Sequence, residues 1–211
     1  MEVANDVAKI MMYNWKPESL DYLVTQKEDT LFEKRISAFT WMPDGSSIIL
    51  NVMKIDKTEK IPPTTKKIKL SIPSKTVEFL PIDGGGLAVS PNGKSVAYIK
   101  QVNGKDQIYS CNFSQKEEKL LVNDTLKKYA VSWSSDGKNL VYNIQIGKGA
   151  NAKVEICTYN IQKNKVKQIT KNRGFKSYAP VWNSKNDKIV YTSEKGDKKD
   201  QIYLNQILIK N

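Results

Sequence analysis

The sequence predicts an all-β protein, a β-propeller of about five blade units, of which one or two are short or atypical. The first observation behind this is a repeat: five times, an aromatic or apolar residue precedes a tight turn and an alternating apolar strand. The second is its spacing, with steps of 26, 48, 44 and 49 residues. Periods of roughly 40–50 residues made of short strands are typical of propeller blades. The repeated residues, here called the blade anchors, are Trp15, Trp41, Val89, Trp133 and Trp182.

The turns after the anchors contain the residues that hairpins need. Asp44-Gly45, Asn92-Gly93 and Asp136-Gly137 each combine a side chain that accepts backbone hydrogen bonds with a glycine that tolerates positive φ. Pro43 and Pro91 supply the fixed φ that starts a turn. Apolar residues alternate after each turn, as half-buried strands require.

The other elements follow in chain order. A hairpin of residues 20–26 and 30–35 is expected in the short first unit, and a loop insertion at 56–67 in the second. Gly84-Gly85-Gly86 predicts a flexible joint into the third unit, and residues 147–150 a long hairpin tip in the fourth. Third strands are expected at 107–111, 154–159 and 201–204, and outer strands at 119–121 and 166–170.

A chain of 211 residues predicts a single domain, residues 1–211. Its units are expected at approximately 6–36, 37–82, 83–124, 125–173 and 174–211. An open stack would expose apolar blade faces, so closure is expected, with the N-terminal stretch around Val7–Tyr13 completing a sheet begun by the C-terminus. The alternative is an incomplete array that closes by dimerising, or an excised part of a longer propeller.

The tryptophan anchors occupy the same place in their units, and we interpret them as wedges between adjacent blades rather than as a ligand platform. The two cysteines, Cys111 and Cys157, fall in third strands of neighbouring units. The repeat aligns Cys157 with Tyr109 and Cys111 with Tyr159, one step out of register. Because facing sheets lie about 10 Å apart, two buried free thiols are favoured over a disulfide.

These motifs resemble the TolB-like, or WD40-like (PD40-type), β-propeller repeat. The resemblance rests on Val89–Ile99, on Trp133–Tyr142 and on the pairs Ile108-Tyr109 and Ile202-Tyr203, and it extends roughly over residues 9–204. The chain differs from true WD40 repeats because it has no histidine and no Trp-Asp dipeptide. The resemblance implies a propeller fold and a non-enzymatic platform for protein–protein interactions. Members of the TolB kind act in complexes that span the bacterial cell envelope, often beside an α/β domain that this chain lacks.

The chain has no apolar run near the ~18 residues that a membrane span requires. Its first residues are polar, so the sequence contains no signal peptide. The resemblance implies a location in the bacterial cell envelope or periplasm, as an exported protein.

The net charge of +12 is concentrated in the second half of the chain. Residues 1–120 have 17 basic and 15 acidic side chains, whereas residues 121–211 have 17 and 7. One interpretation of the densest run is a solvated outer strand protected against edge pairing; another is a surface for an acidic protein or peptide, an anionic cell-wall polymer or phospholipid head groups. Nucleic acid is least favoured, because Phe175 and Tyr178 nearby fit blade-core positions. This basic stretch comprises Lys163, Lys165, Lys167, Lys171, Arg173 and Lys176.

A second candidate surface is the loop Ile61–Thr65. The absence of histidine excludes Ser-His-Asp and Cys-His nucleophiles and histidine-ligated metals, and two separated cysteines cannot form a structural zinc site. No cofactor is expected, because Gly84-Gly85-Gly86 lacks the residues of a phosphate-binding loop. A glycosidase would need paired carboxylates near a rim. The candidates are Asp83, Asp124 and Glu194, whereas Asp44, Asp136 and Asp187 are interpreted as turn formers.

Three functions therefore follow as hypotheses. The first is the non-enzymatic interaction platform. The second is a carbohydrate- or cell-wall-binding propeller, lectin-like or a glycosidase. The third is the propeller portion of an S9-type peptidase, whose hydrolase domain is not in this chain.

Overall fold

The computed structural model describes residues 9–14, 19–25, 32–56, 58, 60, 64–171, 175–195 and 198–208. Within these ranges the regular elements are strands, apart from one short 3₁₀ turn at Gly149–Asn151 in the hairpin tip expected there. The predicted all-β class is confirmed. No helix in the described ranges has the length and apolar character needed to cross a membrane.

The chain divides into two compact units, residues 1–82 and 83–211. In the first unit, two strands form one antiparallel sheet: β1 (Lys9–Asn14) and β2 (Ser19–Thr25). Four further strands pair in chain order in a second antiparallel sheet: β3 (Phe32–Trp41), β4 (Ser47–Asp56), β5 (Thr64–Ser71) and β6 (Val77–Leu80).

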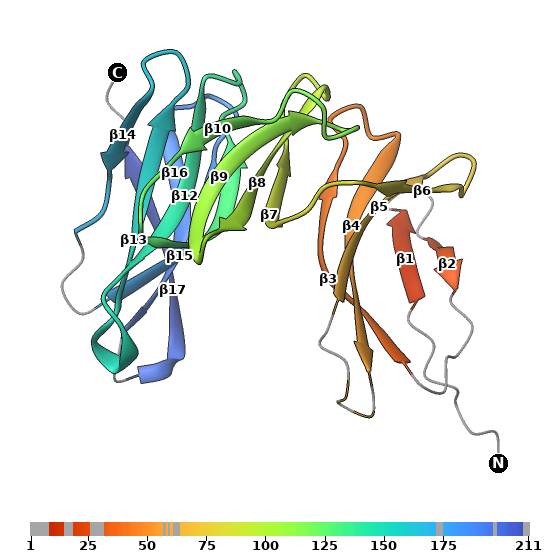
Figure 1. The fold of residues 1–211 in the computed structure, drawn as a ribbon, viewed down its shortest axis with the longest axis horizontal. Helices are drawn as coiled ribbons and strands as arrows, with labels where there is room; N and C mark the ends of the chain where they lie inside the picture. The colour runs from red at the N-terminus through yellow and green to blue at the C-terminus, as the bar shows by residue number, and fades with distance from the viewer. Residues whose placement is uncertain are drawn as a thin grey trace. The chain divides into compact units, whose positions relative to one another are not determined.

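The second unit contains three antiparallel sheets whose strands also pair in chain order (Figure 1). The first is β7 (Gly85–Val89), β8 (Ser95–Val102), β9 (Lys105–Asn112) and β10 (Lys119–Val122). The next is β11 (Lys127–Trp133), β12 (Asn139–Ile146), β13 (Lys153–Asn160) and β14 (Lys165–Gln168). The last is β15 (Phe175–Trp182), β16 (Lys188–Lys195) and β17 (Lys198–Leu208). The expected third and outer strands coincide with β9, β13, β17, β10 and β14.

The same turn joins the first and second strands of four sheets. In three of them a glycine with φ near +70° donates its N–H to the carbonyl three residues earlier, at Gly45, Gly93 and Gly137. The predicted roles of Asp44 and Asp136 are confirmed, because each accepts the N–H two residues later. In the fourth turn Asn183 Oδ1 accepts the N–H groups of Asp187 and Lys188, and Asp187 Oδ1 accepts a hydrogen bond from Asn183 Nδ2 at 2.6 Å, so Asp187 takes part in the turn through a side-chain bond and not by accepting a backbone N–H.

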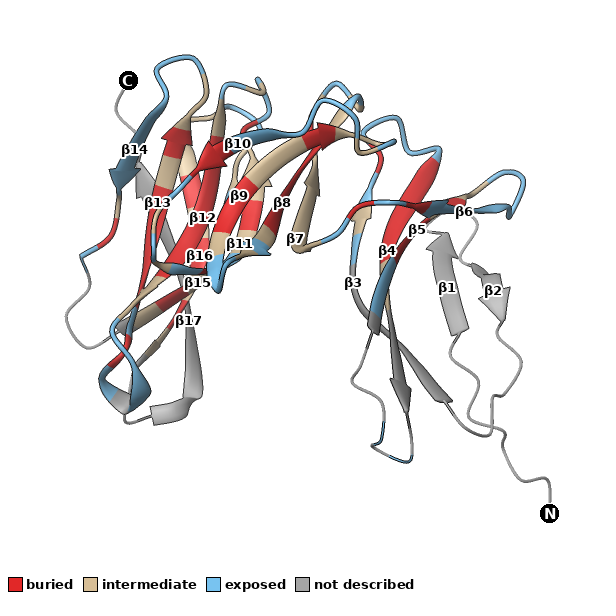
Figure 2. Cartoon of the chain, viewed as in Figure 1, coloured by how far each residue is buried: buried red, intermediate tan, exposed pale blue. Residues whose placement is uncertain are grey.

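The core of the second unit consists of sheet faces packed on one another. One buried cluster joins Ile99 and Ile108 of the β7–β10 sheet to Leu140 and Tyr142 of the β11–β14 sheet. Another contains Ile156 of the β11–β14 sheet together with residues of β16. Figure 2 shows the buried positions running along β8, β12 and β13. Stacked sheets with apolar contact faces are the arrangement that propeller blades require.

The β3–β6 sheet has an apolar face that is buried only along its middle. Register places two apolar residues of each strand on this face, and the side chains of β4 and β5 are buried. On the outer strands, Phe39 is 70% exposed, Phe79 is 69% exposed and Trp41 is 46% exposed. Large apolar side chains exposed together are uncommon on monomers and mark a surface that other groups cover.

Several sequence expectations in the first unit were wrong. Residues 20–26 and 30–35 do not form a hairpin, because β2 pairs with β1 and β3 pairs with β4. Among the described strands β1 pairs with β2 alone, so the N-terminal stretch does not complete the C-terminal sheet. The expected insertion at 56–67 is shorter, because Thr64 already pairs with Lys54. Residues 61–63 lie outside the described residues.

Candidate binding site

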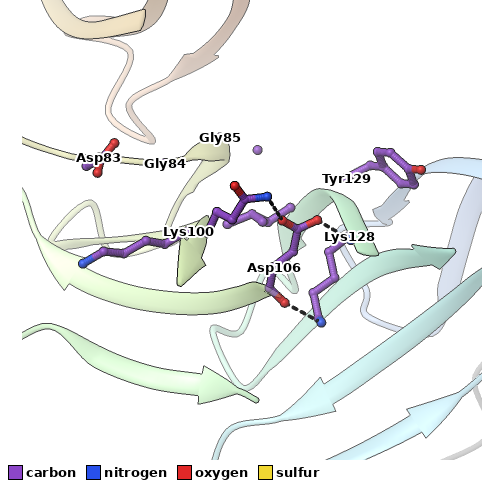
Figure 3. A pocket seen from close by; sticks show the side chains of 10 residues that line it. Asp83, Gly84, Gly85, Lys100, Asp106, Lys128 and Tyr129 are labelled. Atoms are coloured by element: carbon purple, nitrogen blue, oxygen red, sulfur yellow. Dashed lines mark hydrogen bonds between the residues drawn. The ribbon is translucent and has the colours of Figure 1, made fainter. Parts of the chain in front are cut away.

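A cavity of about 430 Å³ lies in the second unit, where the first strands of two neighbouring sheets begin (Figure 3). Its walls come from the start of β7, the end of β8, the β8–β9 hairpin and the start of β11. This volume is at the small end of the range of about 300–1,000 Å³ for ligand pockets. The lining residues are Asp83, Gly84, Gly85, Gly86, Ile99, Lys100, Gln101, Asp106, Lys128 and Tyr129.

Two of the three glycines are required by close packing. Gly84 has φ +146°, and a Cβ there would lie 2.5 Å from the carbonyl oxygen of Ile99. Gly86 has φ +57°, and its Cβ would lie 2.7 Å from the carbonyl oxygen of Tyr129. Only glycine allows β7 to pass so close to both neighbours. The expectation of a flexible joint stays a prediction; close packing explains the glycines at positions 84 and 86.

Gly85, between them, differs from both. Its φ lies outside the left-handed region, and a Cβ built on it meets no atom within 4 Å. Gly85 lines the cavity, so a side chain at this position would point into open space. The backbone conformation and the packing of the chain therefore do not require glycine at position 85.

Lys128 joins the β7–β10 sheet to the β11–β14 sheet through hydrogen bonds of its side chain and its backbone. Its side chain is fully buried, and its Nζ donates to Asp124 Oδ1 at 2.6 Å and to the carbonyls of Asp106 and Leu126 at 2.8 and 2.9 Å. The Lys128 N–H also donates to Asp106 Oδ2 at 3.2 Å. A buried ammonium is stable only with such partners. Lys128 therefore contributes to the wall of the cavity without a free charge.

Lys100 forms an ion pair with Glu118, which does not line the cavity. Its Nζ lies 2.9 and 3.1 Å from the two carboxylate oxygens of Glu118, which also accepts the hydroxyl of Tyr98. The hydrogen bonds to Glu118 raise the pKa of Lys100. Burial raises the pKa of Tyr98, and the bond to Glu118 raises it further. Figure 3 shows the Lys100 side chain extending away from Asp106.

Within the described residues, the two carboxylates of the lining, Asp83 and Asp106, form no ion pair. Asp83 has neither a hydrogen-bond nor an ion-pair partner among the described residues. Asp106 is half-buried and accepts two neutral donors, the Lys128 N–H and, at 3.5 Å, Gln101 Nε2. Both cations of the lining thus form ion pairs with carboxylates outside it, whereas neither carboxylate of the lining forms an ion pair within the described part of the chain; Lys100 interacts with Asp83 only at longer range.

Tyr129 lines the cavity on the side away from Asp83, and its ring extends away from Asp106 (Figure 3). Tyr129 is 38% exposed, its hydroxyl donates to Gln145, and Lys127 Nζ lies 5.4 Å from its ring centroid. The lining of the cavity thus includes Tyr129, two carboxylates and side-chain-free backbone at Gly85.

The structure places the candidate carboxylates separately. Asp83 lines the cavity, whereas Asp124 accepts the Lys128 ammonium and the Leu126 N–H and stabilises the loop before β11. Glu194 pairs in register with Lys176 across β15 and β16. Asp106 was missed by the sequence analysis. Its hairpin contains no motif, and it meets Lys128 only because the two sheets stack.

The basic stretch follows the outer edge of the β11–β14 sheet. Lys163, Lys165, Lys167 and Lys171 are exposed, and Lys176 is half-buried on β15. Arg173 lies outside the described residues, as does Ile61–Pro63 of the second candidate surface. The lysines of this stretch do not line the cavity described above.

The blade anchors occupy different surroundings. Trp133 packs against the cluster between the first two sheets of the second unit, and its Nε1 donates to the carbonyl of Ala88 at 3.1 Å. Trp182 packs against Ile156 and Ile189. Val89 is half-buried, Trp41 is partly exposed, and Trp15 lies outside the described residues.

The register predicted for the cysteines is confirmed. Tyr98 pairs with Tyr109 and Tyr142 with Cys157, so Cys157 and Tyr109 are equivalent. Both thiols are free and buried, as expected. Burial raises the pKa of Cys157 to about 12, which keeps this thiol protonated and unreactive at neutral pH.

Comparison with known proteins finds similarity in structure only. No family model and no curated protein matches the sequence. TolB from Acinetobacter baumannii superposes with a TM-score of 0.68 at 17% identity, covering 95% of this chain and 48% of that one. A putative TolB from Agrobacterium tumefaciens gives 0.59 at 17% identity, covering 95% and 84%.

A third similar structure is the β-propeller domain of the Trilobed protease from Pyrococcus furiosus, described as having an open velcro topology. Its TM-score is 0.52 at 15% identity, covering 75% of this chain and 48% of that one. This chain spans about half the length of the A. baumannii TolB. The matches show a fold of the TolB-like propeller kind, and because they include a protease they show the fold alone.

Proposed function

We propose that the protein is an interaction platform whose cavity at the start of β7 and β11 binds an extended segment of a partner protein. The observation that carries the proposal is Gly85, which keeps the cavity open although no local constraint demands glycine. Rigid stacked sheets with loops at their ends hold such a site in place. The five sheets are proposed to be blade units of one propeller domain, acting in the bacterial cell envelope or periplasm.

The basic stretch is proposed as a second, separate surface for an acidic partner or an anionic cell-wall polymer. Its exposed lysines lie on the outer strand β14, where charge also protects an edge against pairing. No particular residue of this chain supports the third hypothesis, that the protein is the propeller portion of an S9-type peptidase.

A carbohydrate ligand is the second candidate for the cavity. Tyr129 and the unpaired carboxylates Asp83 and Asp106 are side chains that sugar sites also use. A glycan that competes for the cavity would favour this candidate.

Affinity capture from a cell-envelope extract of the source organism tests the main proposal. The baits are the unmodified protein, Gly85→Leu, which fills the cavity, and a triple reversal of Lys163, Lys165 and Lys167 to Glu. One dominant protein retained by the first and third baits and lost by Gly85→Leu is expected. A protein lost only by the lysine variant would move the site to the basic stretch, and retention of glycans alone would support the carbohydrate candidate.

A further inference from the structure

The cavity has a charge pattern opposite to that of the chain. The protein has a formal net charge of +12. Within the cavity, however, the ammonium groups of Lys128 and Lys100 are held by Asp124 and Glu118, which do not line it. Among the described residues, Asp83 and Asp106 therefore face the cavity without an ion-pair partner, although Lys100 lies near enough to Asp83 to interact with it electrostatically. A ligand group that enters the cavity meets these two carboxylates of its lining.

The lining of the cavity suits a side chain with an apolar stem and a charged end. Ile99 and Tyr129 are among the lining residues, and Gly85 contributes no side chain. The stems of lysine and arginine pack along such surfaces while their charged ends remain hydrated or paired. An arginine can also stack its guanidinium on a tyrosine ring.

The strand beside the cavity can hold the backbone of a ligand. β7 is the last strand in the order of its sheet, and its register with β8 shifts between Gly85 and Ala88. No described strand pairs with the other edge of β7. Extended peptides bind to free sheet edges through main-chain hydrogen bonds, and alternate side chains then enter pockets.

We propose that the cavity takes the side chain of a lysine or arginine in an extended peptide, paired with Asp106 and attracted by Asp83 at the mouth. This proposal rests on the proposed function of the same site and specifies the chemistry of its ligand. The positive charge of the whole chain opposes the approach of a cationic peptide. Because added salt screens that repulsion over a Debye length of about 8 Å, binding is expected to weaken little between low and physiological salt.

Fluorescence anisotropy with four labelled peptides tests the proposal. The probes have the sequence Ser-Gly-X-Gly-Ser, with X being arginine, lysine, glutamine or glutamate. The arginine and lysine peptides are expected to bind about tenfold more tightly than the glutamine peptide, which corresponds to about 1.4 kcal/mol. The glutamate peptide is expected to bind most weakly of the four.

Variants that remove a carboxylate charge then show which residue causes the preference for cationic peptides. Asp106→Asn keeps an oxygen that accepts the Lys128 N–H, and it is expected to remove most of the preference for arginine over glutamine. Asp83→Asn is expected to lower the preference severalfold. Glu78→Gln is the matched control, because Glu78 is an exposed carboxylate on β6, outside the cavity. An unchanged arginine preference in the double Asp83→Asn, Asp106→Asn variant would overturn the proposal.

Gly85 variants separate this proposal from the proposed function. Gly85→Ala is expected to weaken binding of all four peptides and Gly85→Leu to abolish it, with thermal midpoints at or above that of the unmodified protein. Equal binding of arginine and glutamine peptides that Gly85→Leu abolishes would preserve the peptide site and reject the cationic ligand. No binding of any peptide would reject both.

Discussion

Ser135 and Asn186 lock two turns of neighbouring sheets together. The side-chain oxygen of Asn186 accepts the Ser135 N–H at 2.7 Å and its hydroxyl at 2.9 Å, and the same hydroxyl lies 2.6 Å from the carbonyl of Ser184. Asn186 has φ +58° at the turn position that glycine occupies in the other three. The side chain required for the lock thus explains why asparagine replaces glycine there.

The corresponding junction between the two preceding sheets has no such lock. Pro91 stands where Ser135 stands and has no N–H or hydroxyl, and Gly137 stands where Asn186 stands. A Cβ on Gly137 would still be 3.9 Å from Pro91. A cavity of about 510 Å³ lies between these turns. The first two sheets of the second unit are joined by the hydrogen bond from Trp133 Nε1 to the Ala88 carbonyl and, at the opposite end of their first strands, by Lys128.

Replacing Asn186 tests the lock. Asn186→Ala removes both hydrogen bonds and leaves a side chain in the left-handed region, so the free energy of unfolding is expected to fall by about 1–2 kcal/mol. Asn186→Gly also loses the bonds but relieves the strain, and a loss of less than about 1 kcal/mol is expected. Urea unfolding of both variants gives the comparison. Variants that are both as stable as the unmodified protein would contradict the lock, and a glycine variant less stable than the alanine variant would contradict the strain assigned to position 186.

The two half-buried tryptophans of the second unit are expected to differ when replaced by phenylalanine. Trp133→Phe removes the indole donor and its hydrogen bond to the carbonyl of Ala88. Trp182 Nε1 is buried and has no hydrogen-bond partner among the described residues, so Trp182→Phe removes no such bond. Because both substitutions remove a similar volume, Trp133→Phe is expected to cost about 1 kcal/mol more in chemical denaturation. Equal costs would mean that the Ala88 bond adds no stability.

Alanine at the glycine run is expected to have opposite effects at adjacent positions. Gly84→Ala and Gly86→Ala place a Cβ against backbone carbonyls at positive φ, and each is expected to lower stability by about 2 kcal/mol or more. Gly85→Ala fits without contact and is expected to raise stability by about 0.5–1 kcal/mol, because it restricts the unfolded chain. Thermal unfolding measures all three. A destabilising Gly85→Ala would show that position 85 is constrained after all.

Stability is expected to fall in alkaline solution. Burial raises the pKa of Cys157 to about 12, and it also raises the pKa values of Tyr98 and Tyr142. As the pH rises, the unfolded chain loses these protons first. The stability from the buried neutral thiol is complete below its unfolded pKa of about 8.5 and is lost as the pH rises toward 12.

Urea unfolding measured at a series of pH values gives this dependence. Cys157→Ala is the control, because it removes one buried titrating group and is expected to flatten the decline that begins near pH 8.5. The tyrosines contribute at higher pH in both proteins. An identical slope in the variant would contradict the assignment to Cys157.

Reversal of Lys163, Lys165 and Lys167 to Glu is expected to abolish salt-sensitive binding of an acidic probe, polyglutamate. The reason is that the reversed charges on β14 and in the turn before it repel an acidic probe, whereas the lysines attract it. Physiological salt already weakens that attraction. The matched control reverses three other exposed lysines, Lys94, Lys116 and Lys119. Titration of polyglutamate at two salt concentrations checks the result. Equal losses in both variants would assign the binding to net charge, and no loss would leave β14 as a protected edge.

The order of the strands was predictable because it depends on local patterns. Asp136-Gly137 closes a hairpin through bonds within six residues, and the alternation that follows makes β12 a strand whatever the rest of the chain does. The equivalence of Cys157 and Tyr109 in neighbouring sheets followed from the same repeat. The pairing partners of β2 and β3 were not predictable in this way, because each strand had an alternative neighbour along the chain.

The sequence by itself determined the all-β class, the turns, the second-unit strands and the third-strand positions of the two free thiols. These depend on periodicity, on glycine and asparagine at positive φ, and on residue counts between turns. Only the tertiary structure decided which charges are satisfied. Lys128 meets Asp106 across two sheets, Asp83 forms no hydrogen bond or ion pair with another described residue, and Gly85 has space where Gly84 and Gly86 have none. Such relationships arise when separate sheets stack, and no spacing within one strand encodes them.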